Sequence, residues 1–314
     1  MKAIPVFVLL LNTPVFWLCL GLGSSPATAA AFSPQLPSPA AAEPERISLW
    51  NGKAPAGEGK TVNADAFVTV HRPEKPNGTS MVICPGGGYG FLVMGAEGHG
   101  IAKWLNKYGI TGIVLQYRLP RGNRFVPLLD AQRAIRLTRS NAAKWDCDPK
   151  KVGIIGFSAG GHLASTAATH FDKGKPDDPD PVNRQGCRPD FAILVYPVIT
   201  MGPKTHGGSR SNLLGGATDA ATVKYYSNEK QVSAETPPVF LTHAKDDRLV
   251  SADNSRLFYK AMKAHKVRGK YLELPRGGHG LNGYKGPMWD AWQSQSLRWL
   301  AAEKLVSKKK RKKK

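Results

Sequence analysis

Apolar, β-branched runs recur along residues 66–274, and stretches of helical length lie between most of them. Short continuous runs of this kind, bounded by Gly, Pro, Asn or Asp, are typical of buried strands. Strands are therefore predicted at Ala66–Val70, Met81–Cys84, Thr111–Tyr117, Val152–Gly156, Phe191–Tyr196, Pro238–His243 and Lys270–Leu274. Because strands alternate with helices, we expect an α/β fold: a mostly parallel central sheet covered by helices on both faces, in three layers.

Several segments between and after the strands have the apolar spacing of helices. A helix over residues 128–145 would carry its apolar side chains on one face and arginines on the other. Further helices are predicted at 256–262 and at 289–300, the latter marked by tryptophans. The segment Gly202–Gln231 breaks the alternation. It is either an insertion near the rim of a functional site or an ordinary surface excursion.

The two ends of the chain differ in composition from the middle. Residues 1–29 are apolar through Leu22 and end in small residues, which predicts a cleaved secretory signal peptide; the alternative is an uncleaved membrane anchor. Residues 30–46 are rich in Ala and Pro and predict a linker. The folded domain is expected over 47–305, in a protein that is secreted or periplasmic.

Positive charge is concentrated at the C-terminus. The chain has a formal net charge of +21, and Lys308–Lys314 alone carries seven positive charges. A run of like charge without apolar residues cannot pack, so residues 306–314 are predicted to be a disordered basic tail. Such a tail fits contact with an anionic wall polymer or a membrane surface, and no specific nucleic-acid partner is expected.

The most informative motif is Gly156-Phe157-Ser158-Ala159-Gly160, which stands between a predicted strand and a stretch of helix formers. A strand, a G-x-S-x-G turn and a helix form a nucleophile elbow, which exposes the serine hydroxyl at the end of a sheet. Ser158 is the predicted nucleophile, and it needs a base, an orienting acid and donors for an oxyanion.

A glycine-rich run, Cys84-Pro85-Gly86-Gly87-Gly88-Tyr89, follows the Met81 strand directly. It resembles the H-G-G-G oxyanion loop of esterases, with Pro85 where His is usual. The N–H groups of Gly87, Gly88 and Ala159 are the predicted oxyanion donors. The alternative, a phosphate-binding loop, lacks the G-K-[ST] end and the spacing of a dinucleotide fingerprint.

Acid and base candidates follow two later strands. Asp246 and Asp247 come after the Pro238 strand, and the spacing favours Asp247 as the acid, with Asp246 as a turn residue. His279 stands among glycines after the Lys270 strand and completes the order Ser…Asp…His that this architecture requires. Tyr89 and Tyr284 are candidates for the walls of the substrate pocket, with ordinary packing as the alternative.

Several longer runs indicate a particular family more specifically than the motifs around Ser158, Asp247 and His279 do. They are Ile83–Tyr89, Glu97–Gly100, Tyr117–Pro120, Gly156–Ala164, Arg188–Phe191 and Ser227–Gln231. Together they resemble the secreted bacterial α/β-hydrolase esterases of the BD-FAE and acetylxylan esterase-like group, over roughly residues 47–303.

This resemblance implies an α/β-hydrolase fold and a carboxylic-ester hydrolase that acts on acylated polysaccharides or oligosaccharides such as acetylated xylan. It assigns Ser158, Asp247 and His279 as nucleophile, acid and base, with no cofactor and no metal. Two alternatives stay open: a serine peptidase or general carboxylesterase on the same scaffold, and an inactive hydrolase-like protein that binds carbohydrate or the cell surface.

Overall fold

The computed structural model describes residues 43–306. The predicted signal peptide, most of the linker and the basic tail from residue 307 lie outside these residues. The folded part begins with strand β1 (Glu45–Ser48), two residues before the predicted start, because β1 pairs with β4 along the edge of the sheet. No helix within residues 43–306 combines the length and the apolar character needed to cross a bilayer.

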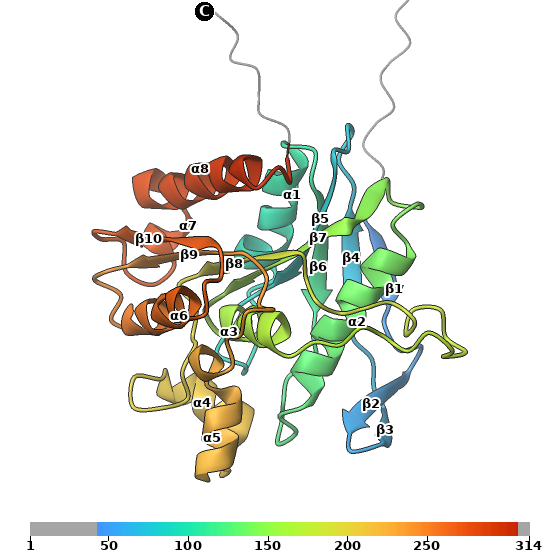
Figure 1. Cartoon of the computed structure of the whole chain (residues 1–314), viewed down its shortest axis with the longest axis horizontal. Coiled ribbons are helices and arrows are strands. Elements are labelled where there is room, and N and C mark those ends of the chain that lie inside the picture. The colour runs from blue at the N-terminus through green and yellow to red at the C-terminus, as the bar shows by residue number, and fades with distance from the viewer. Residues whose placement is uncertain (1–42, 307–314) are drawn as a thin grey trace, which may run out of the picture. The chain divides into compact units, whose positions relative to one another are not determined.

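An eight-stranded sheet forms the centre of the domain, in the order β1-β4-β6-β5-β7-β8-β9-β10 (Figure 1). Pairing is parallel from β6 to β10, while β1, β4 and β6 pair antiparallel. The remaining strands are β4 (Phe67–His71), β5 (Gly78–Cys84), β6 (Thr111–Gln116), β7 (Cys147–Phe157), β8 (Phe191–Val195), β9 (Val239–Ala244) and β10 (Gly269–Leu274). Each predicted strand is therefore confirmed, and β7 begins five residues earlier than expected.

Two apolar cores lie on opposite faces of this sheet. Along β5, Val82 and Cys84 belong to one core, while Met81 and Ile83 belong to the other, because successive side chains of a strand point to opposite faces. Helices α2 (Val126–Ser140), α3 (Ser158–Thr169) and α6 (Asp253–Ala264) cover the first face. Helices α1 (Gly100–Asn106) and α8 (Gly286–Ala302) cover the second. The three-layer prediction is confirmed.

Smaller elements extend from one end of the sheet. The hairpin of β2 (Lys53–Gly57) and β3 (Lys60–Asn63) and the helices α4 (Gly207–Leu214) and α5 (Ala220–Tyr226) project from the lower edge in Figure 1. The segment Gly202–Gln231 thus holds α4, α5 and the 3₁₀ turn η2 (Asn228–Lys230).

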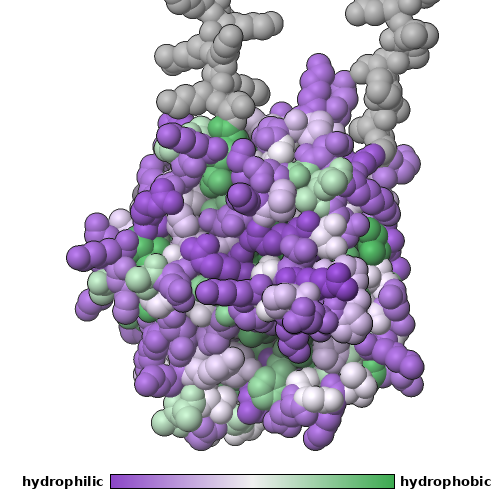
Figure 2. Space-filling model, turned by 45° about the vertical axis from the view of Figure 1, so that its right-hand side comes forward, coloured by the Kyte–Doolittle hydropathy of each residue, from purple (hydrophilic) through white to green (hydrophobic). Residues whose placement is uncertain are grey.

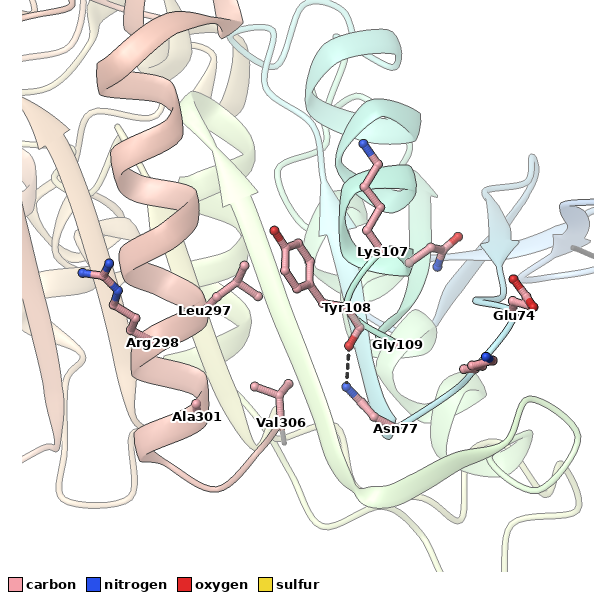
Figure 3. A pocket seen from close by; sticks show the side chains of 11 residues that line it. Glu74, Asn77, Lys107, Tyr108, Gly109, Leu297, Arg298, Ala301 and Val306 are labelled. Carbon is pink, nitrogen blue, oxygen red and sulfur yellow. Dashed lines mark hydrogen bonds between the residues drawn. The ribbon is translucent and has the colours of Figure 1, made fainter. Parts of the chain in front are cut away.

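A cavity of about 830 Å³ lies at the other end of the sheet, before the amino end of β5. Figure 3 shows its walls, with Tyr108 after α1 on the side of Leu297, and with Ala301 of α8 near Val306. The side chain of Asn77 closes one side by donating to the carbonyl of Tyr108 at 2.8 Å. This cavity is remote from the carboxyl ends of the parallel strands, where α/β folds place their functional groups.

Candidate active site

Ser158 occupies a sharp turn between β7 and α3. Its φ is +53°, a left-handed conformation that is uncommon for a residue other than glycine. The turn requires glycine on both sides. A Cβ at Gly156 would lie 2.0 Å from the carbonyl oxygen of Gly160, and a Cβ at Gly160 would lie 2.1 Å from that of Cys84. The G-x-S-x-G sequence therefore has the geometry of a nucleophile elbow.

His279 lies within hydrogen-bond distance of the serine, on the loop that follows β10. Its Nε2 atom is 2.9 Å from Ser158 Oγ. Asp246 holds this loop by accepting hydrogen bonds from the N–H groups of Gly277 and Gly278, at 3.2 and 2.9 Å. The ring of Tyr196 packs against the imidazole at a centroid distance of 4.8 Å. Asp246, expected as a turn residue, thus fixes the backbone that carries His279.

Asp247 orients the imidazole from the other side. Its Oδ2 lies 2.7 Å from His279 Nδ1, and since an ionised carboxylate only accepts, Nδ1 carries the hydrogen and Nε2 is free to accept from Ser158. Its Oδ1 accepts from the N–H groups of Leu249 and Val250, at 2.9 and 3.0 Å. The fully buried His243, for which the sequence suggested no role beyond its strand, supports the same carboxylate from 3.2 Å.

These contacts keep the acid ionised. Burial alone would raise the pKa of Asp247, but the hydrogen bonds from His243 and His279 outweigh it and hold the pKa well below its usual value. The structure therefore brings Ser158, His279 and Asp247 into one hydrogen-bonded chain and leaves Asp246 outside it.

The glycine-rich loop after β5 lies beside the serine. A Cβ at Gly86 would come within 3.0 Å of Ser158 Cβ, so the loop backbone approaches the nucleophile as closely as glycine allows. Gly87 and Gly88 have φ values of +126° and +61°. Their N–H groups have no acceptor within residues 43–306, and Ala159 lies in the first turn of α3, where backbone N–H groups lack intrahelical partners. All three predicted donors thus remain available to an external oxyanion.

A buried carboxylate that the sequence analysis did not assign connects these loops. Glu97, on the single π-helical turn η1 (Gly95–His99), is 2% exposed. Its Oε2 accepts from the N–H of Gly86 at 2.7 Å, and its Oε1 accepts from the hydroxyls of Tyr196 and Tyr284 at 2.9 and 3.1 Å. Burial raises the pKa of Glu97, although these hydrogen bonds lower it in part. The only signal in the sequence was its place in the run Glu97–Gly100.

The two tyrosines proposed as pocket walls lie in different surroundings. Tyr89 is 2% exposed, and its hydroxyl lies 2.9 Å from His162 Nδ1 inside the protein. This disagrees with a role at the pocket wall and agrees with the packing alternative. Tyr284 is half-buried and belongs to the turn α7 (Leu281–Tyr284), whose residues all have left-handed φ values; its place at the pocket wall stays a prediction.

The segment Gly202–Gln231 contacts the oxyanion loop directly. The side-chain amide of Asn212, on α4, donates to the carbonyl of Gly88 at 2.9 Å. This contact places the segment at the rim of the site, as the first of its two interpretations expected. Within residues 43–306 we find no group of three His, Cys, Asp or Glu side chains arranged to hold a metal ion.

Chemically, the arrangement is suited to nucleophilic attack by a hydroxyl on an acyl group. A base touches the nucleophile, an ionised acid orients the base, and the loop with the free N–H groups of Gly87 and Gly88 approaches the nucleophile closely. Comparison with known proteins agrees with this geometry: the BD-FAE family model matches residues 70–262. The chain belongs to the BD-FAE family. Its fold is the α/β-hydrolase fold.

Named relatives of this BD-FAE chain include an acetylxylan esterase and an endo-1,4-beta-xylanase. It is 39% identical over 214 residues to the acetylxylan esterase of Xylanibacter ruminicola, covering 67% of this chain and 42% of that protein. It is 38% identical over 218 residues to endo-1,4-beta-xylanase B of Butyrivibrio fibrisolvens, covering 68% of this chain and 34% of that protein. The chain thus spans less than half the length of these curated relatives.

Among solved structures, the acetyl ester-xyloside bifunctional hydrolase from Caldicellulosiruptor lactoaceticus superimposes with a TM-score of 0.78. It is 36% identical in sequence, and the match covers 84% of this chain and 97% of that one. The BD-FAE chain therefore resembles this hydrolase along nearly the whole length of that protein.

Proposed function

We propose that this protein is an exported serine esterase that removes acetyl groups from xylan or its oligomers. The observation that carries the proposal is the hydrogen-bonded chain from Ser158 through His279 to Asp247, beside N–H groups that have no acceptor within the described residues. The names of the relatives support the substrate class, since two of them, as printed, name an acetyl ester and two name xylan.

In the first step, His279 Nε2 takes the proton of Ser158, and Oγ attacks the ester carbonyl carbon. The carbonyl oxygen becomes an oxyanion that accepts from the N–H groups of Gly87, Gly88 and Ala159. One such donor typically contributes about 2.7–4 kcal/mol in the transition state. The imidazolium then protonates the sugar oxygen, the ester bond breaks, and the acyl group stays on Ser158.

In the second step, water replaces the sugar. His279 takes a proton from the water, the resulting hydroxide attacks the acyl-enzyme, and the tetrahedral intermediate forms in the same oxyanion hole. His279 returns the proton to Ser158 Oγ as acetate leaves. Asp247 keeps its negative charge throughout, because its hydrogen bonds favour the ionised form, and it stabilises the imidazolium that forms twice in each cycle.

Export and surface contact rest on the sequence at the two ends of the chain. The apolar start with its Ala-rich end supports a secretory signal, and export agrees with a polymeric substrate outside the cell. The basic run Lys308–Lys314 supports contact with an anionic wall polymer or membrane surface.

The test is acetate release from acetylated xylan by the wild type, by Ser158→Ala and by Ser294→Ala, a control at an exposed serine on α8. We expect release by the wild type and the control, and a loss of at least about a thousandfold for Ser158→Ala. An unchanged rate for Ser158→Ala would disprove the assigned nucleophile. Hydrolysis of aryl acetates without release from xylan would instead favour the general carboxylesterase alternative.

A further inference from the structure

A second cavity, of about 620 Å³, lies at the carboxyl end of β6, on the side of β5 away from Ser158, and is lined by Leu92 and Met94 from the loop after β5. Its walls come from the loop after β6, from the β2–β3 hairpin and from the loop after β5. In Figure 2, which turns the β2–β3 side of the molecule forward, the lower part of the surface is hollowed and exposes apolar residues. The volume lies within the range of about 300–1,000 Å³ that is usual for ligand sites.

The inner wall of this cavity is bonded to the oxyanion loop itself. Tyr117 lines the cavity and donates its hydroxyl to the carbonyl of Pro85 at 2.8 Å. Leu92 and Met94 also line it, and Val93 between them donates its N–H to the carbonyl of Gly86 at 3.0 Å. Since β6 lies on the side of β5 away from β7, the cavity lies across this loop from Ser158 and the triad.

A different side of the oxyanion loop is covered by helix α4. Helix α4 contacts it there through the bond from Asn212 to Gly88, and Ser209 of the same helix is the nearest neighbour that a Cβ at Gly88 would meet. A polymer whose ester reaches Ser158 must leave the site along an open side. Helix α4 fills the side of the loop that it contacts, whereas the cavity leaves space on the β6 side.

The cavity carries groups suited to a neutral sugar chain. The side-chain amide of Gln116 and the guanidinium of Arg121 are exposed and have no partner within residues 43–306. Val62, 44% exposed, lines the cavity from the hairpin, and Leu92 and Met94 add apolar surface from the loop after β5. Sugar rings present hydroxyls that pair with amide and guanidinium groups, and C–H faces that pack on apolar side chains.

We propose that this cavity is a subsite for the polysaccharide backbone, which binds the sugars next to the acylated one. This inference rests on the proposed function and specifies how that site holds its substrate. Gln116 and Arg121 bind sugar hydroxyls, while Val62 of the hairpin and Leu92 and Met94 after the oxyanion loop form the apolar walls.

The test compares the double variant Gln116→Ala/Arg121→Ala with the wild type on two substrates: acetylated xylo-oligosaccharides of increasing length and p-nitrophenyl acetate. Arg298→Ala is the matched control, because Arg298 is also exposed but lines the cavity at the opposite end of the sheet. We expect kcat/KM for the longer oligosaccharides to fall by about tenfold in the double variant, as expected for two lost hydrogen bonds. Its activity on p-nitrophenyl acetate should stay within about twofold, and the control should change neither.

In the wild type and in the control, kcat/KM should increase with oligosaccharide length, and in the double variant this increase should disappear. An equal change on both substrates, or unchanged activity on the long oligosaccharides, would overturn the subsite while leaving xylan deacetylation intact. If the wild type hydrolyses p-nitrophenyl acetate but no acetylated oligosaccharide, the proposed function fails first, and the subsite fails with it.

Discussion

Replacing Glu97 by alanine tests whether a buried carboxylate sets the position of the oxyanion loop. The side chain accepts three hydrogen bonds, from the Gly86 N–H and from the hydroxyls of Tyr196 and Tyr284. Gly86 and Tyr196 are buried, while Tyr284 is half-buried and within reach of water. Each buried donor left without an acceptor costs about 1–3 kcal/mol, so the free energy of unfolding should fall by about 2–6 kcal/mol.

The effect on catalysis follows from the position of Gly86. It precedes Gly87 in the loop, and its backbone lies against Ser158. Without the carboxylate, the N–H groups of Gly87 and Gly88 lose their fixed aim at the developing oxyanion. Loss of one such donor lowers kcat by about 10²–10³-fold. We therefore expect kcat for p-nitrophenyl acetate to fall by about 100-fold, with a smaller change in KM, because the donors act mainly in the transition state.

The assay is initial-rate kinetics on protein whose folded state is checked by urea unfolding. Glu97→Gln is the conservative partner, since its amide oxygen still accepts from Gly86 while its NH₂ group faces hydroxyls that can rotate to accept. It should retain kcat within about tenfold. A folded Glu97→Ala variant with kcat within about threefold of the wild type would refute the reasoning. If that variant does not fold, a loss of about 100-fold in a folded Glu97→Gln would refute it equally, because the acceptor is kept.

Three further predictions concern the same end of the sheet. Asp247→Asn should lower kcat by about 10⁴-fold, whereas Asp246→Asn should cost less than about tenfold, and comparable losses in the two variants would contradict the assignment of the acid. Gly160→Ala should lower the free energy of unfolding, measured by urea denaturation, by at least about 1–3 kcal/mol, because its Cβ would meet the Cys84 carbonyl at 2.1 Å. An unchanged free energy of unfolding would mean that the elbow tolerates the methyl group. Burial raises the pKa of Glu97 above its ordinary 4.5 in the folded protein, so this carboxyl stabilises the fold below that pH and loses its contribution as the pH rises through the folded pKa. The Tm of Glu97→Gln relative to the wild type should therefore rise as the pH increases above 4.5, and a constant difference would contradict the raised pKa.

The features that were predictable from the sequence are those whose cause is local. A strand needs only its own apolar run, and the elbow needs glycines at fixed offsets from Ser158, so both could be located from neighbouring residues alone. The order Ser158, Asp247, His279 then limited the remaining choice to two adjacent aspartates. The strands β1, β2 and β3 were missed because their sequences are short and largely polar or small, and β1 gains its place by pairing with β4.

The features that could not be predicted depend on contacts between distant residues. Glu97 meets Tyr196 across 99 residues of sequence and Tyr284 across 187, and nothing near any of the three indicates the others. Tyr89 is a second example: the sequence left open whether its side chain lies at the pocket wall or packs inside the protein. A tyrosine next to an oxyanion loop can face either a substrate or the core. Here it faces the core, because its hydroxyl bonds with His162, 73 residues later in the sequence.

Several residues around the triad have unfavourable local structure. Ser158 adopts a left-handed φ, the residues from Gly280 to Tyr284 all do so, and Glu97 is a carboxylate buried at a cost that its raised pKa records. Each of these persists because surrounding contacts determine it: β7 and α3 fix the serine, Glu97 fixes Tyr284, and two tyrosines and Gly86 fix Glu97. A fold needs none of this strain for its own stability, since its two apolar cores lie on either side of the sheet. The strain is instead accounted for by the short distances that it creates between the nucleophile, the base and the loop that receives the oxyanion.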